Sequence, residues 1–322
     1  VEEVGAQGLQ SISRAVQEGN RREKTVLAAL KAQTTTEGVS KVVCGYVEEL
    51  QAEEEAREAV ESVDRRQRGM RRALVSQPVV RWVVDKATQS DAKGALDPAV
   101  IALVKAGSVS ARTETGLLAY AVEKDNLLLL EAMLTHASDL PESDMVRALR
   151  HVLVTCSQSA MHAYITAHAA SEPQVQVMDY DTVRRHLLDL VLVLPRDHWL
   201  LVARLREMSL KEAERMLRYC HSLLKMYGVA PSAQLPRPSN ARVPSLSCVV
   251  DWTNALVDAH FAAFVLSPDT TALLKEVEES TKAEARLTKE MISLDGLLQH
   301  LVQRKPLPVR PIPKYTVDTL ML

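Results

Sequence analysis

The chain has 322 residues, of which 47% are hydrophobic but only 4% aromatic, and its net charge is −2. The low content of Gly (11) and Pro (14) is typical of a helical protein, and the scarcity of aromatic residues predicts an aliphatic core. The near-neutral charge excludes a global electrostatic attraction to nucleic acid. The length suits two domains or one extended helical array.

No stretch reaches the roughly 18 uninterrupted apolar residues of a membrane span, and no signal peptide opens the chain. We therefore expect a soluble, intracellular protein. Because the chain begins at Val1, we also expect that an N-terminal portion is missing. The four cysteines are far apart, without a C-x-x-C motif or a histidine at ligand spacing, so reduced thiols are expected. They are Cys44, Cys156, Cys220 and Cys248.

Residues 1–77 are predicted to form N-terminal helices and an acidic and basic connector. One long helix is expected from about residue 39 to 74, with glutamates toward its start and arginines toward its end, as the helix dipole favours. Either the charges form a solvated helix face or connector, or the arginines bind RNA phosphates. No aromatic side chains accompany them to stack bases, which weakens the RNA interpretation. The arginines are Arg65, Arg66, Arg68, Arg71 and Arg72.

Residues 78–228 are predicted to form an array of short amphipathic helices without a fixed-period repeat, that is, stacked helical hairpins in an irregular α-solenoid. Asp97, Asp181 and Asp197 are expected to cap helix starts, because a carboxylate accepts the unpaired N–H groups of a first turn. Ser209 and Glu212 form a predicted capping box before the next helix.

Residues 229–244 form a predicted proline-rich loop, and residues 245–304 a C-terminal pair of helices. Both phenylalanines of the chain, Phe261 and Phe264, lie on the first of these helices, so they are expected to anchor the local core. The second helix is predicted to be very long, from Thr270 to Arg304.

The second half of that long helix carries apolar residues at alternating four- and three-residue steps, the spacing of a coiled-coil seam. These residues are Leu287, Met291, Leu294, Leu298 and Leu301. They could pack against the Phe261 helix or against another subunit. The last segment, 305–322, is a proline-rich tail with a terminal apolar tag that favours partner binding. The apolar side chains of the tag are Tyr315, Val317, Leu320 and Leu322.

No zinc-protease, nucleophile-elbow, phosphate-loop or dinucleotide-binding motif occurs in the sequence. None of the nine histidines has neighbours in sequence that suggest a site; His162 and His168, for example, are expected on different sides of a helix. We therefore expect neither an enzyme nor a cofactor or metal site.

The C-terminal third of the chain resembles the end of the nucleolar protein eleven family. The resemblance is carried by the run 208–212, by Leu217-Arg218-Tyr219, by Val250-Asp251-Trp252, by residues 256–261 and by the closing Tyr315-Thr316-Val317-Asp318. It covers about residues 200–322 and extends more weakly upstream to about residue 125. The matching residues are packing and cap residues, so the resemblance identifies no functional site.

Members of this family have an N-terminal β-propeller followed by a helical region, which this chain would represent. The resemblance implies a non-enzymatic scaffold of ribosome biogenesis, in the transcription-associated subcomplex of the small-subunit processome. It would support ribosomal DNA transcription and small-subunit pre-rRNA processing in the nucleolus. The implied partners are WD-repeat subunits such as cirhin, and fibrillarin. Two alternatives remain open, an RNA-binding helical module and an α-solenoid adaptor of another complex.

Overall fold

The computed structural model describes residues 21–33, 35–60, 75–89, 94–137, 139–171, 179–229 and 243–302. This part of the chain is all-α, as predicted. After a helix over residues 21–32, the first half contains α2 (Thr36–Val60), α3 (Gln77–Gln89), α4 (Asp97–Lys105), α5 (Leu117–Glu123), α6 (Leu127–His136) and α7 (Glu142–Arg150). The second half contains the π-helical turn η1 (His151–Thr155), α8 (Gln158–Ser171), α9 (Tyr180–Val193), α10 (His198–Leu205), α11 (Leu210–Val229), α12 (Leu246–Leu266) and α13 (Pro268–Val302).

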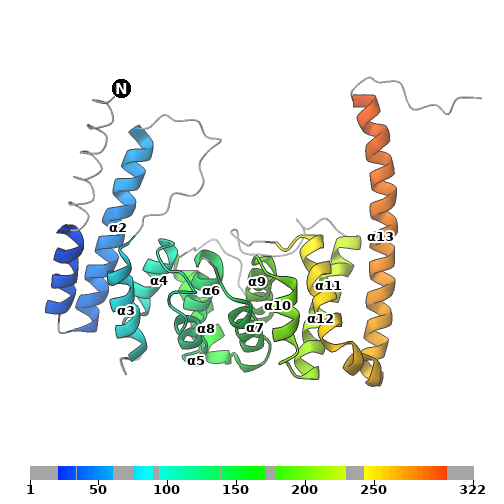
Figure 1. Ribbon diagram of the computed structural model, residues 1–322, viewed down its shortest axis with the longest axis horizontal. Coiled ribbons are helices and arrows are strands. Elements are labelled where there is room, and N and C mark those ends of the chain that lie inside the picture. The colour runs from blue at the N-terminus through cyan, green and yellow to red at the C-terminus, as the bar shows by residue number, and fades with distance from the viewer. Residues whose placement is uncertain are drawn as a thin grey trace, which may run out of the picture.

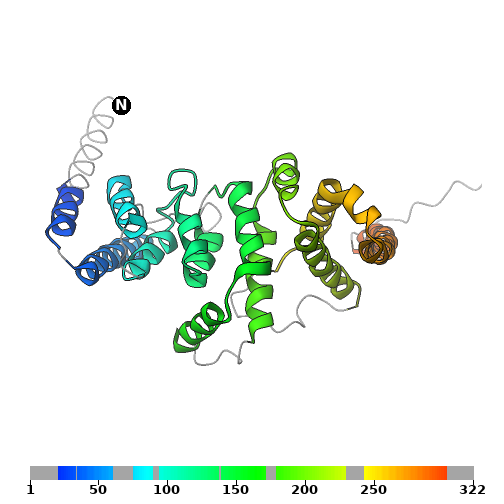
Figure 2. The same ribbon diagram turned by 90° about the horizontal axis from the view of Figure 1, so that it is seen from below.

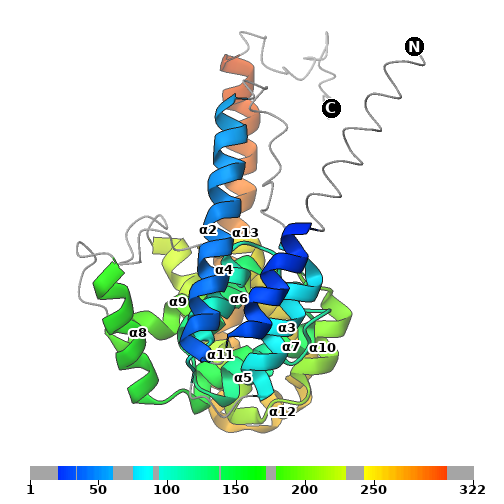
Figure 3. The same cartoon turned by 90° about the vertical axis from the view of Figure 1, so that its left-hand side faces the viewer.

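The helices are arranged along the long axis of the molecule, from the helix over residues 21–32 and α2 at one end to α13 at the other (Figures 1 and 2). Helix α2 packs on α4, α4 on α6, α6 on α8 and α9, and α10 on α7 and α12; α11 packs on both α12 and α13. Helices α2 and α13 rise beyond the others on the same side of the row (Figures 1 and 3). The solenoid architecture stays a prediction, and so do the domain boundaries after residues 77, 228, 244 and 304.

The core is one continuous aliphatic cluster, and Trp252 on α12 is its largest fully buried side chain. The indole N–H of Trp252 donates to the carbonyl oxygen of Leu192 at 3.1 Å, which satisfies its only polar group. The Arg196 guanidinium lies 5.3 Å from the centre of the Trp252 ring and donates to the carbonyl of Cys248 at 3.2 Å. These contacts fix α12 against the end of α9.

Two of the predicted caps are confirmed. The backbone N–H of Ser209 donates to Glu212 at 2.7 Å, and the N–H of Glu212 donates to the Ser209 hydroxyl at 3.4 Å. This is the reciprocal pair of a capping box, and α11 begins at the next residue after Ser209. Asp197 accepts the N–H groups of Trp199 and Leu200 at the start of α10.

The other two cap predictions are wrong. Asp97 is the first residue of α4, and its carboxylate accepts instead from the Tyr120 hydroxyl at 3.0 Å and the Asn126 amide at 2.6 Å. Helix α9 is capped by Asp179, which accepts from the N–H of Thr182, so Asp181 lies within its first turn. Tyr120 and Asn126 donate to Asp97, and Asp179 caps α9 in place of Asp181. The position of an aspartate near a helix start therefore does not by itself decide its role.

Helix α12 is long and apolar enough to cross a membrane by length and composition alone, but it packs in the protein core against α10, α11 and α13. Phe264 on this helix is fully buried, in agreement with the prediction. The expectation for Phe261 is wrong, because this side chain is 59% exposed. The buried face of α12 is set by Val249, Trp252 and Leu256, and Phe261 lies to one side of it.

Candidate protein-interaction surface

The first half of α13 packs on the body of the molecule. Leu273 and Val277 are buried against α11 and α12. The hydroxyl of Thr270, which is fully buried, donates to the carbonyl of Phe264 at 2.6 Å. This bond satisfies one of the carbonyl groups left without a partner at the end of α12, so the turn between the two helices is well determined.

Polar contacts with α11 extend this packing by one more turn. His221 lies 3.2 Å from the Ser280 hydroxyl, and Lys225 makes an ion pair with Glu276 at 3.3 Å. Burial lowers the pKa of His221, and the neighbouring positive charge of Lys225 lowers it further. His221 therefore favours its neutral form at this junction.

Beyond these contacts α13 projects away from the body (Figures 1 and 3). We call Leu287, Met291, Leu294 and Leu298, on this projecting half, the seam. Their exposed fractions run from 44% for Leu287 to 60% for Met291. The fifth residue predicted for the seam, Leu301, lies within α13, but its side chain is outside the described part. The seam is thus a row of large apolar side chains in solvent, an arrangement that favours burial against another surface.

The seam lies close in direction to the face of α13 that packs on the body. At about 100° per residue, the centre of the seam lies only about 50° around the helix from the centre of Leu273 and Val277, so the seam roughly continues that face beyond the body. On the body side, an apolar groove of about 490 Å³ separates α13 from α11 and α12. It is lined in part by Leu246, Val250 and Ile292. The four seam side chains are exposed rather than buried against the Phe261 helix, and the surface that the seam packs against stays a prediction.

Acidic side chains flank the seam. With Met291 and Leu298 at the a positions of a heptad, Glu290 falls at a g position and Asp295 at an e position, and both are exposed. In a parallel pair of identical helices these two positions face each other across the interface, so like charges would meet. The geometry suits a partner helix with basic flanking residues better than a second copy of this chain.

The other predicted site residues lie outside the described residues. This applies to the arginines of the possible RNA patch, Arg65, Arg66, Arg68, Arg71 and Arg72, and to the terminal tag, Tyr315, Val317, Leu320 and Leu322. Their roles stay predictions.

One polar cluster escaped the sequence analysis altogether. Glu131 on α6 lies 3.0 Å from the Nε2 atoms of both His168 on α8 and His186 on α9. Burial acts to raise the pKa of Glu131, but the hydrogen bonds from the two histidines outweigh it and lower the pKa to about 2. These three residues are distant in sequence, so no local pattern could have joined them. They fasten α6, α8 and α9 together.

Comparison with known proteins supports the resemblance found in the sequence. Residues 85–307 match the nucleolar protein 11 C-terminal domain. The chain is 30% identical over 139 residues to nucleolar protein 11 of Xenopus laevis, and 30% identical over 119 residues to that of Gallus gallus. It is 26% identical over 122 residues to a nucleolar protein 11-like protein of Danio rerio.

These alignments cover 43%, 37% and 38% of this chain in the Xenopus, Gallus and Danio comparisons, and 19%, 16% and 16% of the respective relatives. The chain thus spans less than a fifth of the length of these curated relatives. The domain match includes all of α4 to α13, and hence the whole described part of the seam, whereas α2 lies outside it. The chain belongs to the nucleolar protein 11 family, of which it carries the C-terminal domain, and its place in the cell is the nucleolus.

Proposed function

We propose that this chain is a non-enzymatic assembly module of ribosome biogenesis that joins a multi-subunit nucleolar complex through the projecting half of α13. The observation that carries the proposal is the seam, a row of large apolar side chains held in solvent on a helix whose other half is anchored in the core. Membership of the nucleolar protein 11 family supports the nucleolar setting.

Within that setting, the complex is the transcription-associated part of the small-subunit processome, and the role is to support ribosomal DNA transcription and small-subunit pre-rRNA processing. The partners are WD-repeat subunits such as cirhin, with fibrillarin in the same assembly. Their helical regions would offer the second helix that the seam lacks. The terminal tag at 315–322 is proposed to add to the same contact.

Charged substitutions in the seam test this proposal. Leu294→Glu together with Leu298→Glu should abolish co-purification of WD-repeat subunits with the tagged chain, because two carboxylates would be buried without partners. Leu266→Glu is the matched control, since Leu266 is 84% exposed near the end of α12 and outside the seam. Deleting residues 305–322 tests the tag separately. Unchanged co-purification after both changes would refute the proposal.

The alternative of direct RNA binding makes a different prediction. Replacing the five arginines at 65–72 by glutamine should lower RNA affinity and reduce its dependence on salt, because fewer counterions would be released. If the unmodified chain binds no RNA at low salt, this alternative is eliminated.

A further inference from the structure

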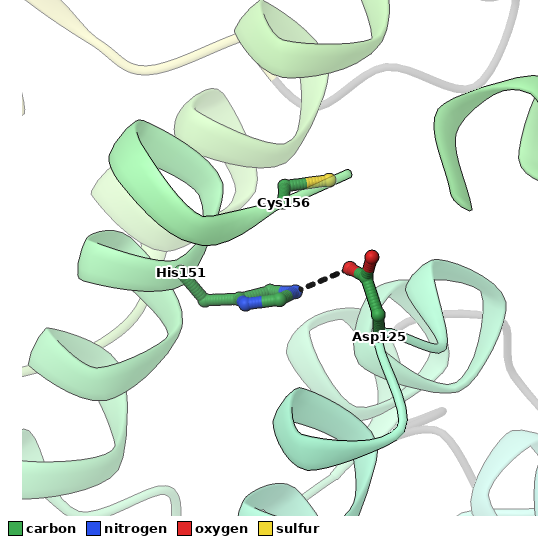
Figure 4. A group of neighbouring side chains, drawn as sticks. All are labelled: Asp125, His151 and Cys156. Carbon is green, nitrogen blue, oxygen red and sulfur yellow. Dashed lines mark ion pairs between the residues drawn. The ribbon is translucent and has the colours of Figure 1, made fainter. Parts of the chain in front are cut away.

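Three metal-binding residue types meet at the centre of the row, far from α13. Asp125 lies in the turn between α5 and α6, His151 begins η1, and Cys156 directly follows it (Figure 4). One ligand atom of each residue lies within 4.8 Å of the others. They are a carboxylate oxygen, an imidazole nitrogen and a sulfur.

The π-helical turn is what brings His151 and Cys156 together. In an α-helix, residues five apart project on different sides. Here the N–H of Cys156 donates to the carbonyl of His151 at 2.9 Å, the i→i+5 bond that defines a π turn. Such turns are frequent at functional sites. Asp125 reaches the pair from the other side with a φ of 53°, in the left-handed region that is uncommon for non-glycine residues.

Two of the three ligand atoms are buried without a hydrogen-bond partner. Asp125 Oδ1 and His151 Nε2 lie 2.9 Å apart as an ion pair (Figure 4), but neither atom makes a hydrogen bond within the described part of the chain. A buried ion pair without hydrogen bonds compensates poorly for the lost hydration of both groups, and only 4% of the His151 side chain is exposed.

The remaining polar atoms of the cluster hold these two in place. The Thr155 hydroxyl donates to the carbonyl of His151 at 3.3 Å, so its oxygen accepts from the Nδ1–H of the same histidine at 2.8 Å. In a neutral imidazole this leaves Nε2 with a lone pair directed into the cluster. Asp125 Oδ2 accepts from the N–H of Ser157 at 3.0 Å and from its hydroxyl, which leaves Oδ1 to face His151. This is how outer-shell residues orient metal ligands.

We propose that Asp125, His151 and Cys156 bind a zinc ion. A mixed oxygen, nitrogen and sulfur donor set is one that Zn²⁺ accepts, and three protein ligands leave a fourth position for water. The ion would bind the oxygen and the nitrogen of this ion pair at once. It would also tie the α5–α6 turn to η1 and to the start of α8, across the middle of the row.

Binding must displace one proton. Zinc binds cysteine as the thiolate, so the proton of the Cys156 thiol is released when the ion binds. The step is Zn²⁺ plus Cys–SH giving a zinc–thiolate bond and a free H⁺, while the carboxylate and the neutral imidazole contribute lone pairs without losing a proton.

The test is a titration of the reduced chain with Zn²⁺, followed by calorimetry, and with Co²⁺, followed by visible absorption. The expected result is a 1:1 complex, release of about one proton per ion, and a thiolate-to-cobalt charge-transfer band. Asp125→Asn and Cys156→Ser should each weaken binding by more than about 100-fold, because even outer-shell changes cost about 10- to 100-fold. Thr155→Val should weaken zinc binding by about 10- to 100-fold, as expected for a residue that orients a ligand.

The variants are chosen so that folding does not obscure the result. Asn tolerates the left-handed conformation at 125, and Cys156 is only half-buried. Circular dichroism of the metal-free variants confirms their folding. Cys248→Ser and His162→Ala are matched controls at a cysteine and a histidine outside the cluster, and neither should alter binding. Binding that survives Asp125→Asn and Cys156→Ser, or no 1:1 binding at all, would overturn the proposal.

Discussion

Val277 and Leu294 belong to the same helix, α13, but Val277 is 5% exposed whereas Leu294 is 57% exposed. The first anchors the helix on α11 and α12, and the second lies on a part of the helix that has left the body. One helix thus combines a packing half with a projecting half. This separation allows the contribution of each half to folding and to binding to be measured independently.

The free energy of unfolding should depend on the first half and not on the seam. Leu273→Ala should destabilise the protein by about 2–4 kcal/mol, because it leaves a cavity between α13 and its neighbours. Leu294→Glu with Leu298→Glu should change the free energy by less than about 0.5 kcal/mol, as exposed substitutions do. Urea denaturation measures both. A large loss of stability in the double variant would show that the seam is packed within the chain.

The isolated chain should not associate with itself through the seam. In a parallel pair, Glu290 of one copy would face Asp295 of the other copy, and like charges at these positions oppose pairing. Sedimentation should therefore give a monomer at micromolar concentration. A dimer that Leu294→Glu dissociates would contradict this prediction.

Stability should fall in acid because of Glu131. Its pKa is lowered to about 2 in the folded chain from an ordinary value of 4.5, so the folded state favours the carboxylate. The stabilisation is present above pH 4.5 and is lost as the pH falls toward 2; it amounts to at most about 3 kcal/mol. Glu131→Gln should remove this part of the pH dependence in urea melts between about pH 5 and pH 3. Glu279→Gln, at an exposed position on α13, should retain it.

The capping box at the start of α11 should contribute measurably to stability. Ser209→Ala removes the hydroxyl that accepts from the N–H of Glu212, at a cost of about 1 kcal/mol. Thermal unfolding measures this cost. Ser222→Ala, at an exposed site within the same helix, is the control and should be close to neutral. Equal effects of the two changes would mean that the cap contributes nothing.

Much of the fold could be predicted from the sequence because it depends on local chemistry. The Ser209 and Glu212 pair, the Asp197 cap and the length of α13 follow from residues a few positions apart. The roles of Asp97 and Phe261 could not be predicted, because they depend on helices distant in sequence. Asp97 accepts from Tyr120 and Asn126, and the neighbours of α12 bury Phe264 but leave Phe261 exposed.

The cluster of Asp125, His151 and Cys156 also could not be predicted from the local sequence. Its histidine and cysteine are separated by a spacing that an α-helix would place on different sides, and only the π turn reverses this. No residue between them marks such a turn in advance. The seam, in contrast, was evident as a heptad pattern, although the sequence left open which surface it packs against.

Site-specific photo-crosslinking tests the central claim most directly. A photoreactive phenylalanine analogue at position 294 or 298, in the nucleolar complex, should crosslink to a helical region of another subunit. The same analogue at position 266 should not. Crosslinks from 294 and 298 only to this chain, or to no protein at all, would contradict the proposal that the projecting half of α13 joins this chain to its complex.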